Sequence, residues 1–277
     1  MADLRPLRGT GSPAPGAATP KGGVPRVESR EPGDRASTGN GLLDHFLRGG
    51  LPRGAATLLL GPPYSGKELV AAGFAHASAV AGEPIAVVLT GMTPTRFRLM
   101  VHQVGSGFEE AEDENRVAYV DCYAGMLGEE ATDPFAVAAP SPDEPESVLR
   151  AVAQARARLG DPARMGVVVL GLTDLVLRAG ARRGPEGHAW LQRLLGQVRR
   201  WEATALLSAE GGVHGDAELS LFRHLCDATI EFMEADDARL FLRARGLGGA
   251  VTRDWVEYVL GDSGLDITGS FTEQKIR

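Results

Sequence analysis

The sequence has little cysteine and no long hydrophobic run. Its two cysteines, Cys122 and Cys226, have the spacing of neither a metal-binding pair nor a disulfide framework. We therefore expect free thiols in a reducing, cytoplasmic compartment. No apolar stretch reaches the roughly 20 residues that a membrane-spanning helix needs, and the N-terminus lacks the hydrophobic segment of a signal peptide. We expect neither a membrane protein nor a secreted one.

An excess of basic charge is also missing. The 29 basic and 36 acidic residues give a net charge of −7, which argues against a dedicated nucleic-acid-binding protein, because phosphate neutralisation supplies most of such a protein's affinity. The six histidines show no metal-ligand spacing. No Ser-His-Asp or Cys-His arrangement supports nucleophilic catalysis. We predict no metal site and no DNA partner.

The chain divides into a tail, one domain and a short end. Residues 1–37 are rich in Pro, Gly, Ala and Arg without hydrophobic periodicity, which predicts a disordered tail. Residues 268–277 are predicted to form a loose C-terminal end. The remaining residues, 38–267, are enough for one sizeable hydrophobic core and are predicted to form a single domain.

Strand-like and helix-like segments alternate through this domain. Short apolar runs predict strands at residues 55–60, 85–89, 117–120, 167–170 and 204–207. Helical spacing predicts helices after residue 67 and at 95–104, 144–159 and 188–201. This alternation is typical of an α/β fold with a mostly parallel sheet. Residues 228–233, 239–245 and 255–260 look like strands joined by short turns, which predicts a C-terminal antiparallel extension.

Lysine is the scarcest charged residue, and its placement is informative. It occurs at three positions, and Lys67 is the only one between Lys21 and Lys275. Lys67 ends the sequence GPPYSGK at 61–67, which matches GxxxxGK, a loop that binds phosphates through backbone N–H groups and a lysine ammonium. A predicted strand precedes the loop and a predicted helix follows it. We predict nucleotide contacts from Gly61, Tyr64, Ser65, Gly66, Lys67 and Glu68.

Glu68 occupies the position where this motif has a Ser or Thr that binds Mg²⁺. Three interpretations remain open: Glu68 stabilises the helix start, binds a metal ion, or either pairs with Lys67 or occupies the anion site itself. Facing a phosphate it would be repulsive, by about 4 kcal/mol per charge pair at 4 Å near a protein surface. Tyr64 adds a second question, because a bulky side chain tolerates a positive φ poorly if the turn needs one.

Several further motifs flank the loop in a fixed order. GLLD at 41–44 and GGLPRG at 49–54 precede it, and TP at 93–94, LT at 172–173, SAE at 208–210 and LRARG at 242–246 follow it. With these motifs the chain resembles the KaiC-like branch of the RecA-superfamily P-loop ATPases over roughly residues 38–267. The resemblance implies a RecA-like sheet with helices on both faces, ATP or ADP as ligand, and assembly with RecA- or KaiC-like protomers. Arg243 and Arg245 match the basic pair that such proteins present to a neighbour's γ-phosphate.

The catalytic parts of that family are missing from this sequence. The paired glutamates that activate water fall at Gly91 and Met92, and the Walker B aspartate falls at Leu170. Phosphoryl transfer needs Mg²⁺ and a group that positions the water. The resemblance therefore implies a regulatory nucleotide-binding protein that does not hydrolyse ATP efficiently, with no catalytic residue and no Mg²⁺ ligand set to assign.

Two other functions remain as alternatives. The chain could be an active ATPase that uses displaced carboxylates at Glu68, Asp174 or Glu210. It could instead be a RecA-like recombination or repair protein, in which the loops at 178–187 and 209–218 would contact DNA. The second of these loops is acidic and neither has interleaved aromatic residues. We predict that both loops, and the acidic stretch 109–114, are solvated connections.

Overall fold

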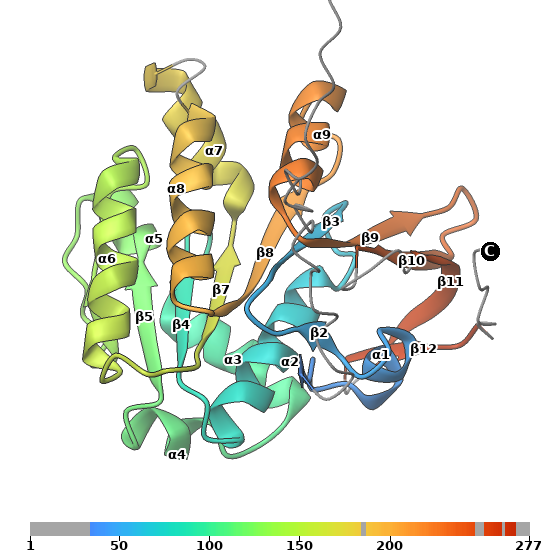
Figure 1. Cartoon of the computed structure of the whole chain (residues 1–277), viewed down its shortest axis with the longest axis horizontal. Coiled ribbons are helices and arrows are strands. Elements are labelled where there is room, and N and C mark those ends of the chain that lie inside the picture. Colours follow the sequence, from blue (N-terminus) through green and yellow to red (C-terminus); the bar gives the residue numbers. More distant parts are fainter. Residues whose placement is uncertain (1–33, 184–186, 247–251, 262–263, 270–277) are drawn as a thin grey trace, which may run out of the picture.

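The computed structural model describes residues 34–183, 187–246, 252–261 and 264–269 (Figure 1). Most of the predicted N-terminal tail and of the predicted C-terminal end lies outside these ranges. Residues 34–37, which the sequence analysis assigns to the tail, are described. They include strand β1, Arg35–Ala36, which pairs antiparallel with β2, Leu51–Pro52.

A mixed ten-stranded sheet forms the centre of the described part of the chain, in the order β12-β11-β10-β9-β3-β8-β7-β4-β5-β6 (Figure 1). The strands are β3 Ala56–Gly61, β4 Ile85–Leu89, β5 Val117–Asp121, β6 Ala136–Ala138, β7 Gly166–Leu170, β8 Thr204–Glu210, β9 Ala228–Glu234, β10 Leu240–Arg245, β11 Thr252–Gly261 and β12 Gly264–Ile267. The strands from β9 to β6 in this order are parallel, and β10, β11 and β12 are antiparallel. The α/β fold and the antiparallel C-terminal extension are confirmed.

The antiparallel part starts one strand later than the sequence pattern indicates. Strand β9 pairs parallel with β3 and antiparallel only with β10. A helix, α9 Asp216–Leu225, connects β8 to β9 and returns the chain to the same end of the sheet. Such a crossover is what a parallel connection requires.

Helices cover both faces of the sheet, as the resemblance implies (Figure 1). One hydrophobic core lies under α1 Gly41–Phe46, α2 Lys67–Val80, α3 Pro94–Val104 and α4 Phe108–Asp113. The other lies under α5 Cys122–Leu127, α6 Pro145–Arg158, α7 Leu172–Arg183, α8 Gly187–Arg200 and α9. Neighbouring strand residues alternate between the two cores: Leu59 belongs to the first, Leu58 and Leu60 to the second. Burial on both faces explains why the central strands are continuous apolar runs.

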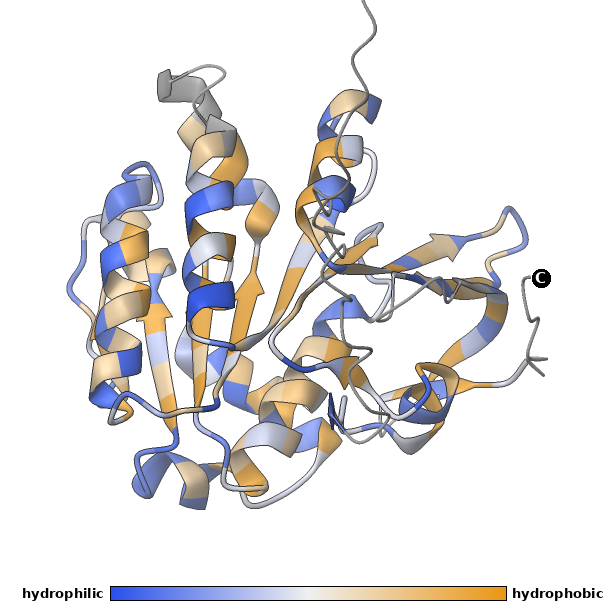
Figure 2. Cartoon of the chain, in the orientation of Figure 1, coloured by the Kyte–Doolittle hydropathy of each residue, from blue (hydrophilic) through white to orange (hydrophobic). Residues whose placement is uncertain are grey.

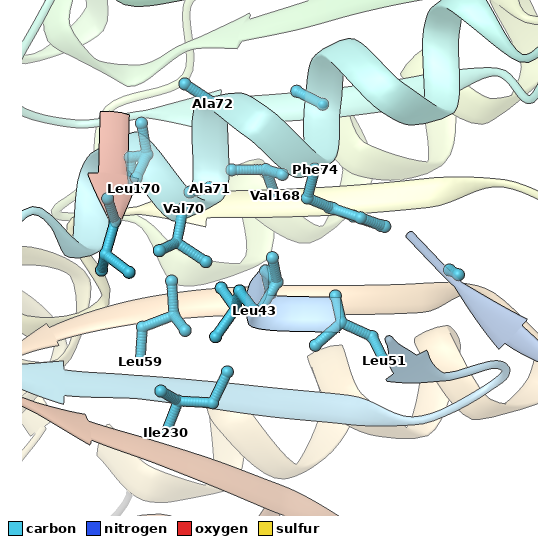
Figure 3. Close-up of a cluster of buried hydrophobic side chains, with 14 of the residues drawn as sticks. Leu43, Leu51, Leu59, Val70, Ala71, Ala72, Phe74, Val168, Leu170 and Ile230 are labelled. Atoms are coloured by element: carbon cyan, nitrogen blue, oxygen red, sulfur yellow. The ribbon is translucent and has the colours of Figure 1, made fainter. Parts of the chain in front are cut away.

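The helix after the phosphate-binding loop is anchored by the first core. Figure 3 shows Val70 and Phe74 of α2 above Leu59 and Ile230 of the sheet, all of them buried. The start of α2 is therefore fixed against the C-terminal end of β3.

In Figure 2 the strands are largely orange, while the polar residues of α6 and α8 colour their outer faces blue.

Two predicted connections are helical. Helix α7 continues to Arg183, so residues 178–183 are not the loop that the sequence analysis expects. Leu172, Leu175, Val176 and Ala179 recur at helical spacing and are buried, a signal that the basic residues of this segment obscured. The acidic stretch 109–114 is mostly helix α4, and Glu112 is buried rather than solvated.

The glycine-rich approach to β3 has structural roles. Gly50 has a φ of 110°, and a Cβ atom there would lie 2.2 Å from the carbonyl oxygen of Ala36. Asp44 accepts hydrogen bonds from the backbone N–H and Oγ1 of Thr38, at 2.7 Å each. These contacts tie α1 to the segment that contains β1.

Candidate functional site

The phosphate-binding loop connects the C-terminal end of β3 to the first residue of α2. Gly66, the residue before the helix, has a left-handed backbone with φ 80°. A Cβ atom at Gly61 would lie 2.6 Å from Cβ of Phe232, so this position takes no side chain without a shift of the neighbouring strand. Tyr64 has a φ of 64° with its side chain 93% exposed. The turn thus needs the positive φ that a tyrosine tolerates poorly.

Lys67 points into the loop and is fully buried. Its Nζ donates a 3.0 Å hydrogen bond to the carbonyl oxygen of Pro62. The same nitrogen lies 2.9 Å from Oε1 of Glu68, and 3.0 and 3.1 Å from the two carboxylate oxygens of Glu210. Of the three interpretations of Glu68, the structure has the one in which this carboxylate pairs with Lys67.

Strand β11 fixes the shape of the loop from the side. The hydroxyl of Tyr258 donates a 2.6 Å hydrogen bond to the carbonyl oxygen of Ser65. Burial raises the pKa of Tyr258, and the nearby carboxylates of Glu234 and Glu68 raise it further, so this donor keeps its proton. Sequence reasoning missed Tyr258, because nothing local connects a residue nearly 200 positions away to the loop.

The loop has unused hydrogen-bonding capacity that suits a phosphate. Ser65 is buried, and its Oγ has no hydrogen-bond partner within the described parts of the chain. The first N–H groups of α2 have no acceptor inside the helix, as at every helix start. Together with the ammonium of Lys67, these donors fit a phosphate group, because a helix start attracts anions. The predicted contact residues Gly61, Tyr64, Ser65, Gly66, Lys67 and Glu68 run from the last residue of β3 to the first turn of α2.

Glu210 reaches Lys67 from the end of β8, which is held in place by several hydrogen bonds. Its N–H donates to Oγ1 of Thr173 at 2.8 Å, and the N–H of Gly211 donates to the carbonyl oxygen of Gly61 at 2.7 Å. Thr173 Oγ1 also lies 2.9 Å from Nε2 of His214, whose other ring nitrogen lies 2.7 Å from Glu218. The side chain of His214 is fully buried. Residues 209–218 are thus the end of β8, a short fixed connection and the start of α9.

The sequence analysis expects catalytic carboxylates at the positions of Gly91, Met92 and Leu170, and none of these three residues carries one. Leu170 is buried at the end of β7, and its carbonyl oxygen lies 3.1 Å from Thr90 Oγ1. Gly91 is exposed, and Met92 packs against the first hydrophobic core. Asp174 accepts a 2.8 Å hydrogen bond from Thr90. In the described residues, no cluster of three or more His, Cys, Asp or Glu could hold a metal ion.

Arg243 is engaged within its own chain. Its Nε and Nη2 donate to one carboxylate oxygen of Glu231 at 2.8 and 2.5 Å, and its guanidinium lies 4.4 Å from the ring centroid of Trp255. Glu231 is buried and also accepts a 3.0 Å hydrogen bond from Arg223. Leu242 and Ala244, the neighbours of Arg243 in β10, face the α2 side of the sheet, so Arg243 and the exposed Arg245 face the opposite side.

The cysteines supply no nucleophile. Both are free and buried. Burial, with the nearby charge of Asp121 for Cys122 and of Asp227 for Cys226, raises the pKa of each thiol to about 12. At neutral pH both are protonated, unreactive core residues.

The model of a family described as an ATPase, KaiC, matches residues 36–235. The chain belongs to the KaiC ATPase family. A UPF0273 protein of Methanopyrus kandleri is 37% identical over 95 residues, 34% of this chain and 38% of that protein. A UPF0273 protein of Aeropyrum pernix is 33% identical over 98 residues, 35% of this chain and 40% of that one. The chain thus matches less than half the length of either relative.

A solved structure has the same fold. The KaiC-like protein from Pyrococcus horikoshii superposes with a TM-score of 0.64 at 20% identity, covering 84% of this chain and 98% of that one.

Membership of an ATPase family implies nucleotide binding. None of the helices in the described ranges is both long and apolar enough to cross a membrane.

Proposed function

We propose that this KaiC-family chain binds ATP or ADP at residues 61–67, does not hydrolyse ATP efficiently, and acts as a regulatory module by assembling with partner proteins. The observation that carries the proposal is the combination of an ordered loop around Lys67 with Gly91, Met92 and Leu170 at the catalytic positions. The loop donors, Ser65 and Lys67 would hold the phosphates.

The alternative of an active ATPase depends on carboxylates that are engaged elsewhere. Glu68 and Glu210 pair with Lys67, and Asp174 is bonded to Thr90. A group that positions water must face the reacting phosphate rather than the lysine that binds it. For the recombination alternative, the basic segment 178–183 lies in helix α7, and the start of α9 carries Asp216 and Glu218. Neither observation favours a DNA partner.

Assembly with a KaiC-like protomer is part of the proposal. Arg243 would have to leave buried Glu231 to reach a neighbour's phosphate, and a buried carboxylate stripped of a partner is costly. Arg245 is exposed on the same side of the sheet and carries no such cost. We therefore assign the contact with a neighbour to Arg245 and a structural role to Arg243.

Calorimetric titration with ATP and with ADP, each with and without Mg²⁺, tests nucleotide binding. We expect both ligands to bind the wild-type chain. Lys67→Ala should weaken binding by at least about tenfold, or 1.4 kcal/mol, because it removes the only ammonium in the loop. Mg²⁺ should change the affinity by less than about threefold, since position 68 offers no hydroxyl to the metal.

Arg164→Ala is the matched control. Arg164 is exposed and precedes β7, at the opposite end of the sheet from the loop. The substitution therefore removes one positive charge, as Lys67→Ala does, but far from the loop. Wild-type chain that binds neither nucleotide, or equal affinities for the wild-type and Lys67→Ala chains, would contradict the proposal.

A further inference from the structure

The ammonium of Lys67 is already fully neutralised within the chain. It is completely buried, and three oxygen-bearing groups surround it at 2.9 to 3.1 Å: Pro62, Glu68 and Glu210. A lysine that binds phosphate needs free donor positions, and an ammonium has only three. A phosphate group can therefore reach Lys67 only by taking the place of one of these partners.

Glu210 is the partner most able to leave. Pro62 belongs to the loop backbone, and Glu68 is the direct neighbour of Lys67 in the chain. The side chain of Glu210 is 33% exposed, so it has a path to water. Its backbone cannot follow, because the N–H groups of Glu210 and Gly211 are bonded to Thr173 and Gly61. The exchange is thus a rotation of one side chain on a fixed strand end.

We infer that Glu210 is a specificity-determining residue, a carboxylate that competes with phosphate for Lys67 and so lowers the affinity for nucleoside di- and triphosphates relative to that for monophosphates. The inference rests on the proposed function. A ligand whose phosphates reach Lys67 replaces the carboxylate charge with its own. A monophosphate that ends before Lys67 leaves the lysine paired with Glu210 and gains nothing from it.

Replacement of Glu210 removes the competitor. In Glu210→Gln the side chain keeps its shape and loses its charge, so the unbound state loses an ion pair and the bound state loses a repulsion between carboxylate and phosphate. Both changes favour binding. We expect the affinities for ATP and ADP to rise by at least about tenfold, equivalent to 1.4 kcal/mol, while the affinity for AMP changes by less than about threefold.

The second readout requires no nucleotide. Lys67 is buried, and loss of one of its two carboxylate partners should lower the melting temperature of the nucleotide-free chain. A variant that is less stable on its own and yet binds ADP more tightly is the signature of a competing internal ligand. A purely structural role for Glu210 predicts instead that stability and affinity fall together.

Glu130→Gln is the matched control. Glu130 is exposed and follows α5, next to strand β5, which is four strands away from β3 in the sheet. The substitution therefore removes the same charge far from the loop. It should change neither readout. Unchanged or weaker binding of ADP to Glu210→Gln in the absence of Mg²⁺ would overturn the inference, as would an equal gain for AMP. If neither chain bound any nucleotide, the proposed function would fail as well. If wild-type chain bound nucleotide and Glu210→Gln did not differ from it, only the role of Glu210 would fail.

Discussion

At the scale of single residues, Tyr64 has the least favourable backbone in the phosphate-binding loop. A φ of 64° brings the Cβ atom of an L-residue close to its own backbone, at a cost of about 1–2 kcal/mol. The side chain is almost completely exposed and regains little by packing. The loop conformation is therefore imposed by its neighbours, Gly61, Gly66 and the contact of Ser65 with Tyr258.

Substitution of Tyr64 tests this backbone strain. We expect Tyr64→Gly to be more stable than Tyr64→Ala by about 1 kcal/mol, because glycine adopts a positive φ without a steric cost and alanine does not. Both variants lose the same exposed ring, so their difference isolates the backbone. Urea unfolding of the two variants gives the comparison. Equal free energies of unfolding would mean that residue 64 does not hold a left-handed backbone in solution.

The sequence motif identifies the loop residues but not their partners. Gly61, Gly66 and Lys67 follow from spacing alone, because the chemistry of phosphate binding requires them at those positions. Glu210 appears in the sequence analysis only as an alternative catalytic carboxylate, and Tyr258 does not appear. Both reach the loop through the order of strands in the sheet, which sequence periodicity does not specify.

At the scale of helices and strands, Arg98 connects α3, α4, β5 and the segment before β6. Its Nε lies 2.8 Å from both oxygens of buried Glu112, and its other nitrogens donate to Asp133 at 2.6 and 3.0 Å. The hydroxyl of Tyr119 donates to Glu112 at 2.5 Å. Burial alone would raise the pKa of Asp133, but the hydrogen bonds from Arg98 and from the N–H of Phe135 outweigh it, and the net pKa is lowered. This carboxylate therefore contributes stability above pH about 4, and the contribution is lost as the pH falls through its lowered pKa.

Removal of Glu112 should be costly. Glu112→Ala leaves Arg98 with one carboxylate and the Tyr119 hydroxyl with none, inside a buried site. We expect a loss of about 3 kcal/mol in the free energy of unfolding, in the range for a broken buried ion pair. Glu110→Ala, an exposed position in the same helix, should change it by less than about 0.5 kcal/mol. A loss below about 1 kcal/mol for Glu112→Ala would show that the cluster is not formed in solution.

The secondary-structure predictions were correct where hydrophobic periodicity was strong and wrong where charge was used as a guide. The central strands, with their continuous apolar runs, lie within one residue of their predicted bounds, except that β8 runs three residues further, to Glu210. The acidic segment 109–114 and the basic segment 178–183 were assigned to loops, yet the first is mostly helix α4 and the second is the end of helix α7. The parallel direction of β9 depends on α9, a helix that the sequence analysis did not assign.

At the scale of the whole molecule, the C-terminal ends of the parallel strands β3, β4, β7 and β8 lie along one edge of the sheet. Carboxyl ends of parallel strands are where ligands bind in folds of this kind. Here that edge holds a phosphate-binding loop with its lysine and, after β4 and at the end of β7, Gly91, Met92 and Leu170, the positions where the sequence analysis expects catalytic carboxylates. Under the proposed function, the fold keeps a nucleotide-binding loop and has no residue that activates water.

The release of phosphate from Mg·ATP is the most direct test of this account. The wild-type chain should show no release above that of Lys67→Ala, because the proposed function assigns no carboxylate to the activation of water. Glu210→Gln should show none either, even though it binds ATP more tightly. Release by the wild-type chain on the order of 10⁻⁴ s⁻¹ or faster, the range of unassisted P-loop hydrolysis, that disappeared in Lys67→Ala would contradict the account.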